Sequence, residues 1–345
     1  MKMKSMFVLG LCAMAFISCD KEETSNAPID EVVNNRSFAF DEVGAYLDMT
    51  GREKEGEFAA FYSDMTESRT QTFGVEANAP FTVVGDGGTT LSSADGDWRN
   101  SDGDRVEGEV RITLIEVFNK ADMILLDKAT SGVTEDGTAI DALISGGEIF
   151  VKATIGGQEV ELNGALRVEV PTDVADYDMI KFVEADVPGD DLLWVVADDP
   201  AMDVEEREGE GAEGDYVTGY DILPGEWGWS NIDKWASDPC AKTDIFVEVP
   251  AGHNPTNTEV YLSYDGDPGR LANFDMWDSS VDMFTEHYGQ ICIGLDCHFV
   301  AVTNIGGSLE YAIQGATIVN GHIEVIGGFT PTTEAALIAA INALP

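Results

Sequence analysis

The side chains that could do chemistry in this sequence are dominated by carboxylates. The chain has 345 residues, with 64 Asp and Glu against 19 Lys and Arg and a net charge of −45. The serine nucleophile elbow Gly-x-Ser-x-Gly, the zinc motif His-Glu-x-x-His and the phosphate-binding loop are absent from the sequence. A glycosidase needs only two carboxylates. A glycan hydrolase therefore stays open as an alternative, but sequence spacing selects no catalytic pair.

One acidic stretch has the spacing of oxygen ligands. Asp95, Asp97, Asp102 and Asp104 lie between apolar segments, and alternating carboxylates of this kind can surround Ca²⁺. The spacing of an EF-hand loop is not met, and Asp102-Gly103 is also typical of a turn before a strand. We favour the turn, with Ca²⁺ as the alternative, and expect no other cofactor.

Three cysteines follow the N-terminal region, at positions 240, 292 and 297. Outside the cytoplasm thiols tend to pair. Cys292 and Cys297 close the smallest loop and are the first candidates for a disulfide, which would leave Cys240 free; the pairing stays open. A metal site from Cys292, Cys297, His287 and His298 is the weaker alternative, because structural zinc sites use differently spaced cysteine pairs. The four histidines have no nucleophile motif beside them and are expected at surfaces or interfaces.

Tryptophans concentrate in the second half of the chain. Trp227, Trp229 and Trp235 lie within nine residues of one another, and Trp277 follows. Exposed indoles beside Asp and Asn can stack on sugar rings, which makes Trp227, Trp235 and Trp277 a candidate glycan platform. The alternative is core packing, since indoles bury large apolar areas. Trp229 is the strongest candidate for the core.

The N-terminus has the pattern of a lipoprotein signal. Lys2 and Lys4 precede an apolar stretch, 6–17, that is too short to span a bilayer. Ser18-Cys19 resembles the end of a bacterial lipobox, so we expect cleavage before Cys19 and lipidation of that cysteine. The acidic run 20–23 resembles the surface-export signal of Bacteroidota lipoproteins. Several acyl chains would hold the protein firmly on a membrane.

The remaining pattern predicts a mainly β fold: an N-terminal β-sandwich followed by a second β-rich module with a C-terminal helix. Residues 109–118 alternate as a half-buried strand does, and 148–171 reads as a hairpin turning at Gly156-Gly157. Thr330 and Pro331 are expected to begin the only clear helix. The predicted parts are a signal peptide at 1–18, a tether at 19–35, a sandwich at 36–171, strands with an acidic linker (203–215) at 172–220, and the C-terminal module at 221–345.

Several motifs resemble a known group of proteins. Residues 106–110, the Ser145-Gly146-Gly147 segment and the Gly156-Gly157 turn look like the N-terminal module of uncharacterised Bacteroidota surface lipoproteins. That module is distantly similar to the β-sandwich of ankyrins and netrin receptors. Residues 228–233 and 294–299 resemble the C-terminal module of the same group. The resemblance implies a β-rich fold and a surface location, and it implies no activity.

Charge and anchor together limit the function. A net charge of −45 excludes a nucleic-acid binder, because affinity for phosphates comes from Lys and Arg. The expected membrane contact is therefore the lipid at Cys19, on the outer membrane and facing the exterior. We expect a non-catalytic binding or structural role, with extracellular polysaccharide or an outer-membrane protein as partner. The alternatives are the glycan hydrolase and an accessory subunit of an outer-membrane complex.

Overall fold

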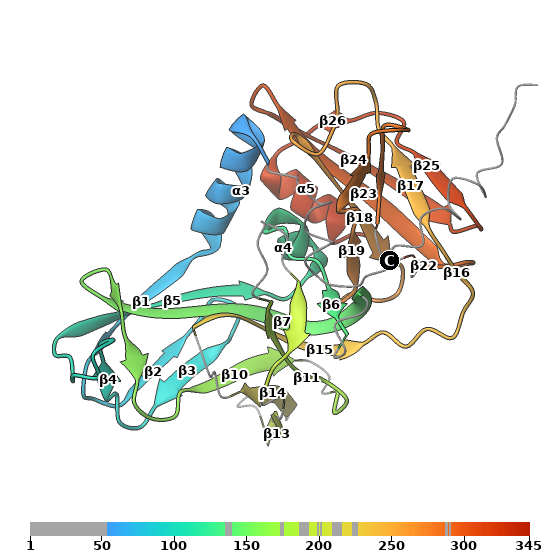
Figure 1. Ribbon diagram of the computed structural model, residues 1–345. Coiled ribbons are helices and arrows are strands. Elements are labelled where there is room, and N and C mark those ends of the chain that lie inside the picture. Colours follow the sequence, from blue (N-terminus) through green and yellow to red (C-terminus); the bar gives the residue numbers. More distant parts are fainter. Residues whose placement is uncertain are drawn as a thin grey trace, which may run out of the picture. The chain divides into compact units, whose positions relative to one another are not determined.

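β-Strands are the main secondary structure of the computed structural model (Figure 1), and the expected mainly β fold is confirmed. The structure describes residues 54–134, 140–172, 176–185, 193–198, 200, 202–208, 216–222, 227–286, 289 and 291–345. All of them belong to one unit, Phe38–Pro345. The expected signal peptide, Cys19 and the tether lie outside the described residues.

The largest sheet runs through the N-terminal part. Its strand order is β1 (Gln71–Glu76), β5 (Glu109–Val117), β7 (Ile140–Ile155), β15 (Gly228–Trp235), β11 (Ile180–Glu184), β12 (Trp194–Val196) and β6 (Ser131–Val133), with β8 (Gln158–Glu159) on β7. Strand β6 also pairs with β7, so five of the strands close into a ring. Its pairings are antiparallel except for the parallel contact of β12 with β6.

Aromatic and aliphatic side chains from this ring pack together. The buried members are Leu143, Phe182 and Trp194, and Trp235 packs edge-on against Phe182 with 5.4 Å between ring centroids. Strand β15 comes after the expected module boundary at residue 221, yet it lies between β7 and β11. The boundary therefore falls inside the stretch of chain that builds the first sheet.

A second sheet covers the other face of β5, β7 and β15. Its order is β13 (Asp203–Glu208), β14 (Tyr216–Ile222), β10 (Arg167–Thr172), β3 (Thr90–Ser93) and β2 (Phe81–Val84). A core that includes Ile112, Val168 and Ile232 joins the two sheets as a β-sandwich. The short strands β4 (Trp98–Arg99) and β9 (Glu161–Leu162) pair beside it. The prediction that 203–215 is a linker was wrong for Asp203–Glu208, which pairs with β14 as a hairpin strand.

The C-terminal part contains two further sheets. One has the order β19 (Leu271–Asn273), β18 (Thr258–Tyr264), β23 (Asp296–Ile305), β24 (Ser308–Thr317) and β26 (Thr330–Pro331). The other has the order β20 (Met276–Asp278), β21 (Met283–Thr285), β17 (Ile245–Glu248) and β25 (His322–Val325). Buried side chains such as Val247, Leu262 and Phe299 fill the space between them. Strands β16 (Lys242–Thr243) and β22 (Ile291–Cys292) form a small ribbon.

Three helices lie against the outer face of the sheet that contains β18 and β23 (Figure 1). The prediction of a single terminal helix missed α3 (Gly56–Arg69) and α4 (Lys120–Leu125). The last helix, α5 (Glu334–Ile341), is capped by Thr333, whereas Thr330 and Pro331 form β26 instead of the expected helix start. Among the described residues, no helix has both the length and the apolar character needed to cross a membrane.

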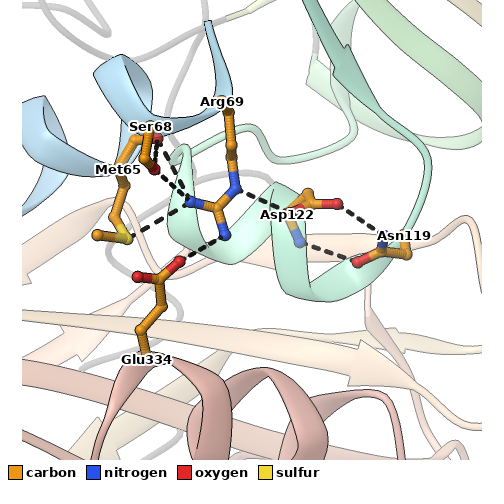
Figure 2. Close-up of polar contacts among 6 residues, drawn as sticks. All are labelled: Met65, Ser68, Arg69, Asn119, Asp122 and Glu334. Carbon is orange, nitrogen blue, oxygen red and sulfur yellow. Dashed lines mark hydrogen bonds and ion pairs between the residues drawn. The ribbon is translucent and has the colours of Figure 1, made fainter. Parts of the chain in front are cut away.

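Arg69 joins the three helices (Figure 2). Its Nε donates to Asp122 Oδ1 at 2.9 Å, and its Nη2 lies 3.2 Å from Glu334 Oε1. Asn119 caps α4 by accepting from the Asp122 backbone N–H, and its own amide donates to the Asp122 carboxylate at 2.7 Å. The C-terminal turn of α3 is thereby fixed to the N-terminal turns of α4 and α5.

Candidate functional site

A buried polar cluster lies on adjacent strands of the first sheet: Ser145 and Glu148 on β7, and Asn231 and Asp233 on β15. Glu148 is directly opposite Asn231, and Asp233 is directly opposite Ser145, with an irregularity in register between the two pairs. Directly paired residues point to the same side of a sheet. Glu148, Asn231 and Asp233 have no exposed surface. The four side chains therefore form one enclosed group, which we call the Glu148 cluster.

Hydrogen bonds satisfy only part of the Glu148 cluster. Ser145 Oγ donates to Asn231 Oδ1 at 2.8 Å, and Asn231 Nδ2 donates to Asp233 Oδ2 at 2.7 Å. Within the described part of the chain, Asp233 Oδ1 and both carboxylate oxygens of Glu148 have no hydrogen-bond partner. A buried charge without a partner is costly. Three buried oxygens thus point to a proton or a cation that compensates the carboxylates.

The environment of the Glu148 cluster favours the protonated form of its carboxylates. Burial raises the pKa of Glu148 well above its usual range, and the nearby Asp233 carboxylate raises it further, while Lys128 opposes both. Burial likewise raises the pKa of Asp233. Lys128 Nζ lies 4.9 Å from the centre of the Trp229 ring, and burial lowers the pKa of this lysine. Since neither carboxylate is exposed, an external substrate does not reach this pair in the described conformation.

A second buried network, in contrast to the Glu148 cluster, contains direct ion pairs. Lys54 Nζ lies 2.5 Å from Asp127 Oδ2 and 3.2 Å from Glu259 Oε1. Tyr261 donates its hydroxyl to Asp127 Oδ1 at 2.6 Å, and the Tyr62 hydroxyl lies 3.3 Å from that of Tyr261. The network links the N-terminal flank of α3, the C-terminal flank of α4 and β18. Both of its carboxylates contact the Lys54 ammonium, so the network connects these elements through ion pairs.

The structure does not bring the candidate glycan platform together. Trp227 stacks against Trp98 with 6.0 Å between ring centroids and donates its Nε1 to the Val160 carbonyl. Trp235 packs into the ring core, and Trp277 packs against the core between the two C-terminal sheets, edge-on to Phe284. Each indole therefore belongs to a different hydrophobic core. All three are half-buried, as the core-packing alternative predicted.

The acidic stretch 95–104 is organised as a turn. Asp97 accepts from Arg99 and Arg105, both at 2.8 Å, and also from Asn163, and these donors hold the pKa of Asp97 well below its usual range. The backbone N–H groups of Asp102 and Asp104 donate to the Asn100 side chain, and the Asp95 N–H faces Ser93 Oγ at 3.4 Å. Across the described ranges, no three His, Cys, Asp or Glu side chains form a metal-binding group.

The candidate disulfide between Cys292 and Cys297 is wrong. Cys240 is bonded to Cys292 instead, with 5.6 Å between the Cα atoms, and Cys297 is free and buried. The reason is the sheet: Cys292 pairs with Lys242 in the β16–β22 ribbon, close to Cys240, whereas Cys297 lies on β23 with its side chain in the core. The same pairing removes Cys292 from the alternative metal set. His298 contacts Asp265 at 2.7 Å, and His287 lies outside the described residues.

A shallow groove of about 360 Å³ lies along the exposed edge of β24. It is lined by Tyr311, Ala312, Ile313, Gln314, Gly327, Gly328, Thr330 and Ala340. Strand β26 pairs with β24 only at Glu310 and Tyr311. Beyond Tyr311, no other strand of the described residues pairs with this edge. A second hollow, of about 410 Å³, lies over β2 and β3 near Phe81.

Backbone geometry shows which groups of β24 face outward. Gly306-Gly307, with φ of 62° and 75°, makes a two-residue turn, so Ile305 and Ser308 form the hydrogen-bonded pair beside it. From this pair onward, every second residue of β24 forms backbone hydrogen bonds with β23, and the residues between them direct their backbone groups outward. The Thr332 N–H donates to the outward carbonyl of Leu309, as this alternation requires. The same alternation directs the backbone N–H and C=O groups of three further residues away from β23, namely Ile313, Gly315 and Thr317.

No family model matches the chain, and a comparison with curated proteins finds no match. The site must therefore be judged from its geometry. Sequence reasoning missed the Glu148 cluster because 64 acids offered no way to choose a pair. A signal was present in β15, where Asn231 and Asp233 stand two residues apart between Trp229 and Trp235. Polar side chains at alternate strand positions face the same side.

Proposed function

We propose that this chain is a lipid-anchored binding protein of the outer membrane that captures an extended polypeptide segment along β24. The unpaired edge of β24 with its adjoining groove carries this proposal. An extended peptide can add to a sheet edge as an extra strand, with main-chain hydrogen bonds giving affinity and side-chain pockets giving specificity. Gly315 is exposed and central among the outward-facing positions.

The anchor part of the proposal is supported by the N-terminal sequence. Lys2 and Lys4, the apolar stretch 6–17 and the Ser18-Cys19 dipeptide have the order of a lipoprotein signal. Lipidation at Cys19 would place the binding edge of the chain outside the membrane. A direct check is the mass of the full chain recovered from bacterial membranes, compared with that of Cys19→Ser, which cannot carry the lipid.

The charge of the chain defines the chemistry of the partner. Glu310 precedes Tyr311 on β24, and Glu324 on β25 accepts from the Gln314 side chain. With 64 acids and 19 bases overall, the protein attracts basic segments and repels acidic ones. We therefore propose a basic, extended segment of an outer-membrane protein as the occupant. This matches an accessory subunit more closely than glycan capture, because the tryptophans of the expected platform pack in separate cores.

The test uses one pair of variants at the edge of β24. Gly315→Pro removes an outward N–H, whereas Gly315→Ala keeps it; a Cβ at this position meets His298 Nε2 at 3.0 Å in both variants. The probe is a fluorescein-labelled octapeptide of alternating Val and Lys, with a Val-Glu octapeptide as charge control, and fluorescence anisotropy reports binding. We expect Gly315→Pro to weaken binding of the Val-Lys peptide at least tenfold and Gly315→Ala to leave it within twofold.

Two outcomes would contradict strand addition. Equal binding by both variants would mean attraction by charge alone, which rising salt would abolish. Absence of peptide binding together with a thermal shift on a soluble polysaccharide would favour glycan capture instead. Thermal melts of both variants confirm that each is folded before binding is compared.

A further inference from the structure

We propose that the Glu148 cluster is a buried binding site for one divalent cation, with Ca²⁺ as the best-fitting ion. The site is separate from the β24 edge and from the acidic stretch 95–104. It combines two carboxylates, from Glu148 and Asp233, with the side-chain oxygens of Asn231 and Ser145. The observation that carries it is the group of three fully buried carboxylate oxygens without a partner among the described residues.

The donor set matches a hard cation. Every available donor atom is oxygen, and Ca²⁺ takes six to eight oxygen ligands from carboxylates, amides and hydroxyls. Both oxygens of Glu148 are open, so this carboxylate can bind in the bidentate manner that Ca²⁺ accepts. Asn231 Oδ1 accepts one hydrogen bond, from Ser145, and keeps a second lone pair. Zinc prefers nitrogen and sulfur, and the Glu148 cluster contains neither Cys nor His.

Charge balance favours a divalent ion. Two ionised carboxylates in a site without solvent require a compensating charge of about two, and a bound Ca²⁺ supplies it directly. Lys128 is the only nearby cation among the described residues that acts on Glu148. Its ammonium group lies over the Trp229 ring, and the ion pairs of the described residues include none between Lys128 and Glu148. The lysine therefore leaves the carboxylates without a direct counter-ion.

The strands hold the donors in place before an ion arrives. β7 is hydrogen-bonded to β5 on one side and to β15 on the other, and β15 is in turn bonded to β11. Ser145 N–H also donates to the Gly269 carbonyl at 2.7 Å. Since both strands are internal, the ligands are fixed by backbone ladders instead of by a mobile loop. Such a site binds with little ordering cost.

The experiment uses the full chain in detergent, treated with EDTA and dialysed. Elemental analysis counts the metal retained after incubation with CaCl₂ and desalting, and thermal unfolding is followed in Ca²⁺, Mg²⁺ and Na⁺ at matched ionic strength. We expect one Ca²⁺ per chain and a Ca²⁺-specific rise in melting temperature of several degrees. Glu148→Gln and Asp233→Asn should both abolish the retained Ca²⁺ and the rise. The double variant Asp102→Asn/Asp104→Asn, which removes two carboxylates of the acidic turn, is the control and should keep both.

Each other outcome overturns the proposal. Equal melting temperatures in all three salts at matched ionic strength, with no retained metal, would leave the cluster compensated by protons or by Lys128. Loss of the Ca²⁺ effect in Asp102→Asn/Asp104→Asn would move the site to the acidic turn. Folding of the variants is checked in EDTA, where Glu148→Gln should melt no lower than the parent, because a neutral amide replaces an uncompensated carboxyl group. The peptide assay at β24 is independent of this site, so either proposal can fail alone.

Discussion

Arg69 on α3 and Glu334 on α5 are 265 residues apart in sequence and lie within 3.2 Å of each other through Nη2 and Oε1 (Figure 2). The same guanidinium also binds Asp122 on α4. An arginine can do this because its planar group carries five N–H donors in a fixed fork. The first helix of the described chain is thus connected to the last one by a single side chain.

Replacing Arg69 by Met should destabilise the protein by about 1–2 kcal/mol, because hydrogen bonds to charged groups are lost while the apolar stem is kept. Urea unfolding at pH 7 measures the change. The control is Lys152→Met, whose ion pair with Glu159 is 42% and 52% exposed. Such a surface pair contributes about 0–1 kcal/mol. Equal losses in the two variants would contradict the special position of Arg69.

Removing the Cys240–Cys292 bond should lower the free energy of unfolding. The bond spans 52 residues, and the chain-entropy model assigns a loop of this length about 4 kcal/mol. Urea unfolding of Cys240→Ser/Cys292→Ser should show most of this loss, and the variant should no longer respond to a reducing agent. Cys297→Ser should respond to the reducing agent as the parent does. A loss of that response in Cys297→Ser would mean that the pairing is different.

The Cys297 thiol should be inert in the folded protein. Burial, with nearby carboxylates such as that of Asp265, raises the pKa of Cys297 to about 12. The thiolate is the reactive form, so at pH 8 the folded protein holds almost none of it. Reaction with a disulfide reagent should be slow in buffer and fast in guanidinium chloride. Rapid labelling without denaturant would show that β23 opens readily.

Acid should weaken the contact between Asp238 and Arg270. The Arg270 guanidinium donates to Asp238 at 2.5 Å and holds the pKa of that carboxyl below its usual value. A lowered carboxyl pKa in the folded state stabilises the protein above the unfolded pKa of about 4, and this contribution is lost as the pH falls. Asp238→Asn should therefore be less stable than the parent at pH 7, with the difference shrinking toward pH 3. A constant difference would contradict this origin.

The sequence predicted the parts of the fold where side chains alternate strictly. The strand expected at 109–118 is β5, and the expected Gly156-Gly157 turn joins β7 to β8, with Ile155 and Gln158 as the pair beside it. These elements are local: each depends on residues close in sequence. The helix α3 was missed although Phe58, Phe61, Tyr62 and Met65 have helical spacing and are buried. The glycines and acidic residues that flank these four positions made the helical spacing hard to recognise.

Long-range pairing could not be predicted in the same way. The disulfide depends on β22 lying beside β16, and the Glu148 cluster depends on β15 pairing with β7 about 80 residues earlier in the chain. No local pattern specifies either partner. Asp97, a candidate Ca²⁺ ligand, forms a hydrogen bond with Arg99 instead. Trp227, a candidate for the glycan platform, stacks on Trp98.

The closed ring of β7, β15, β11, β12 and β6 has a consequence for how the chain matures. Its strands enter in the chain order β6, β7, β11, β12, β15, and β15 bridges β7 to β11. During synthesis or export, the ring cannot close until the chain as far as Trp235 is available. Until then the earlier strands keep unpaired edges. Such delayed, non-local closure slows folding and exposes strands to wrong partners. A dense negative charge along the waiting chain would keep neighbouring copies apart during that interval.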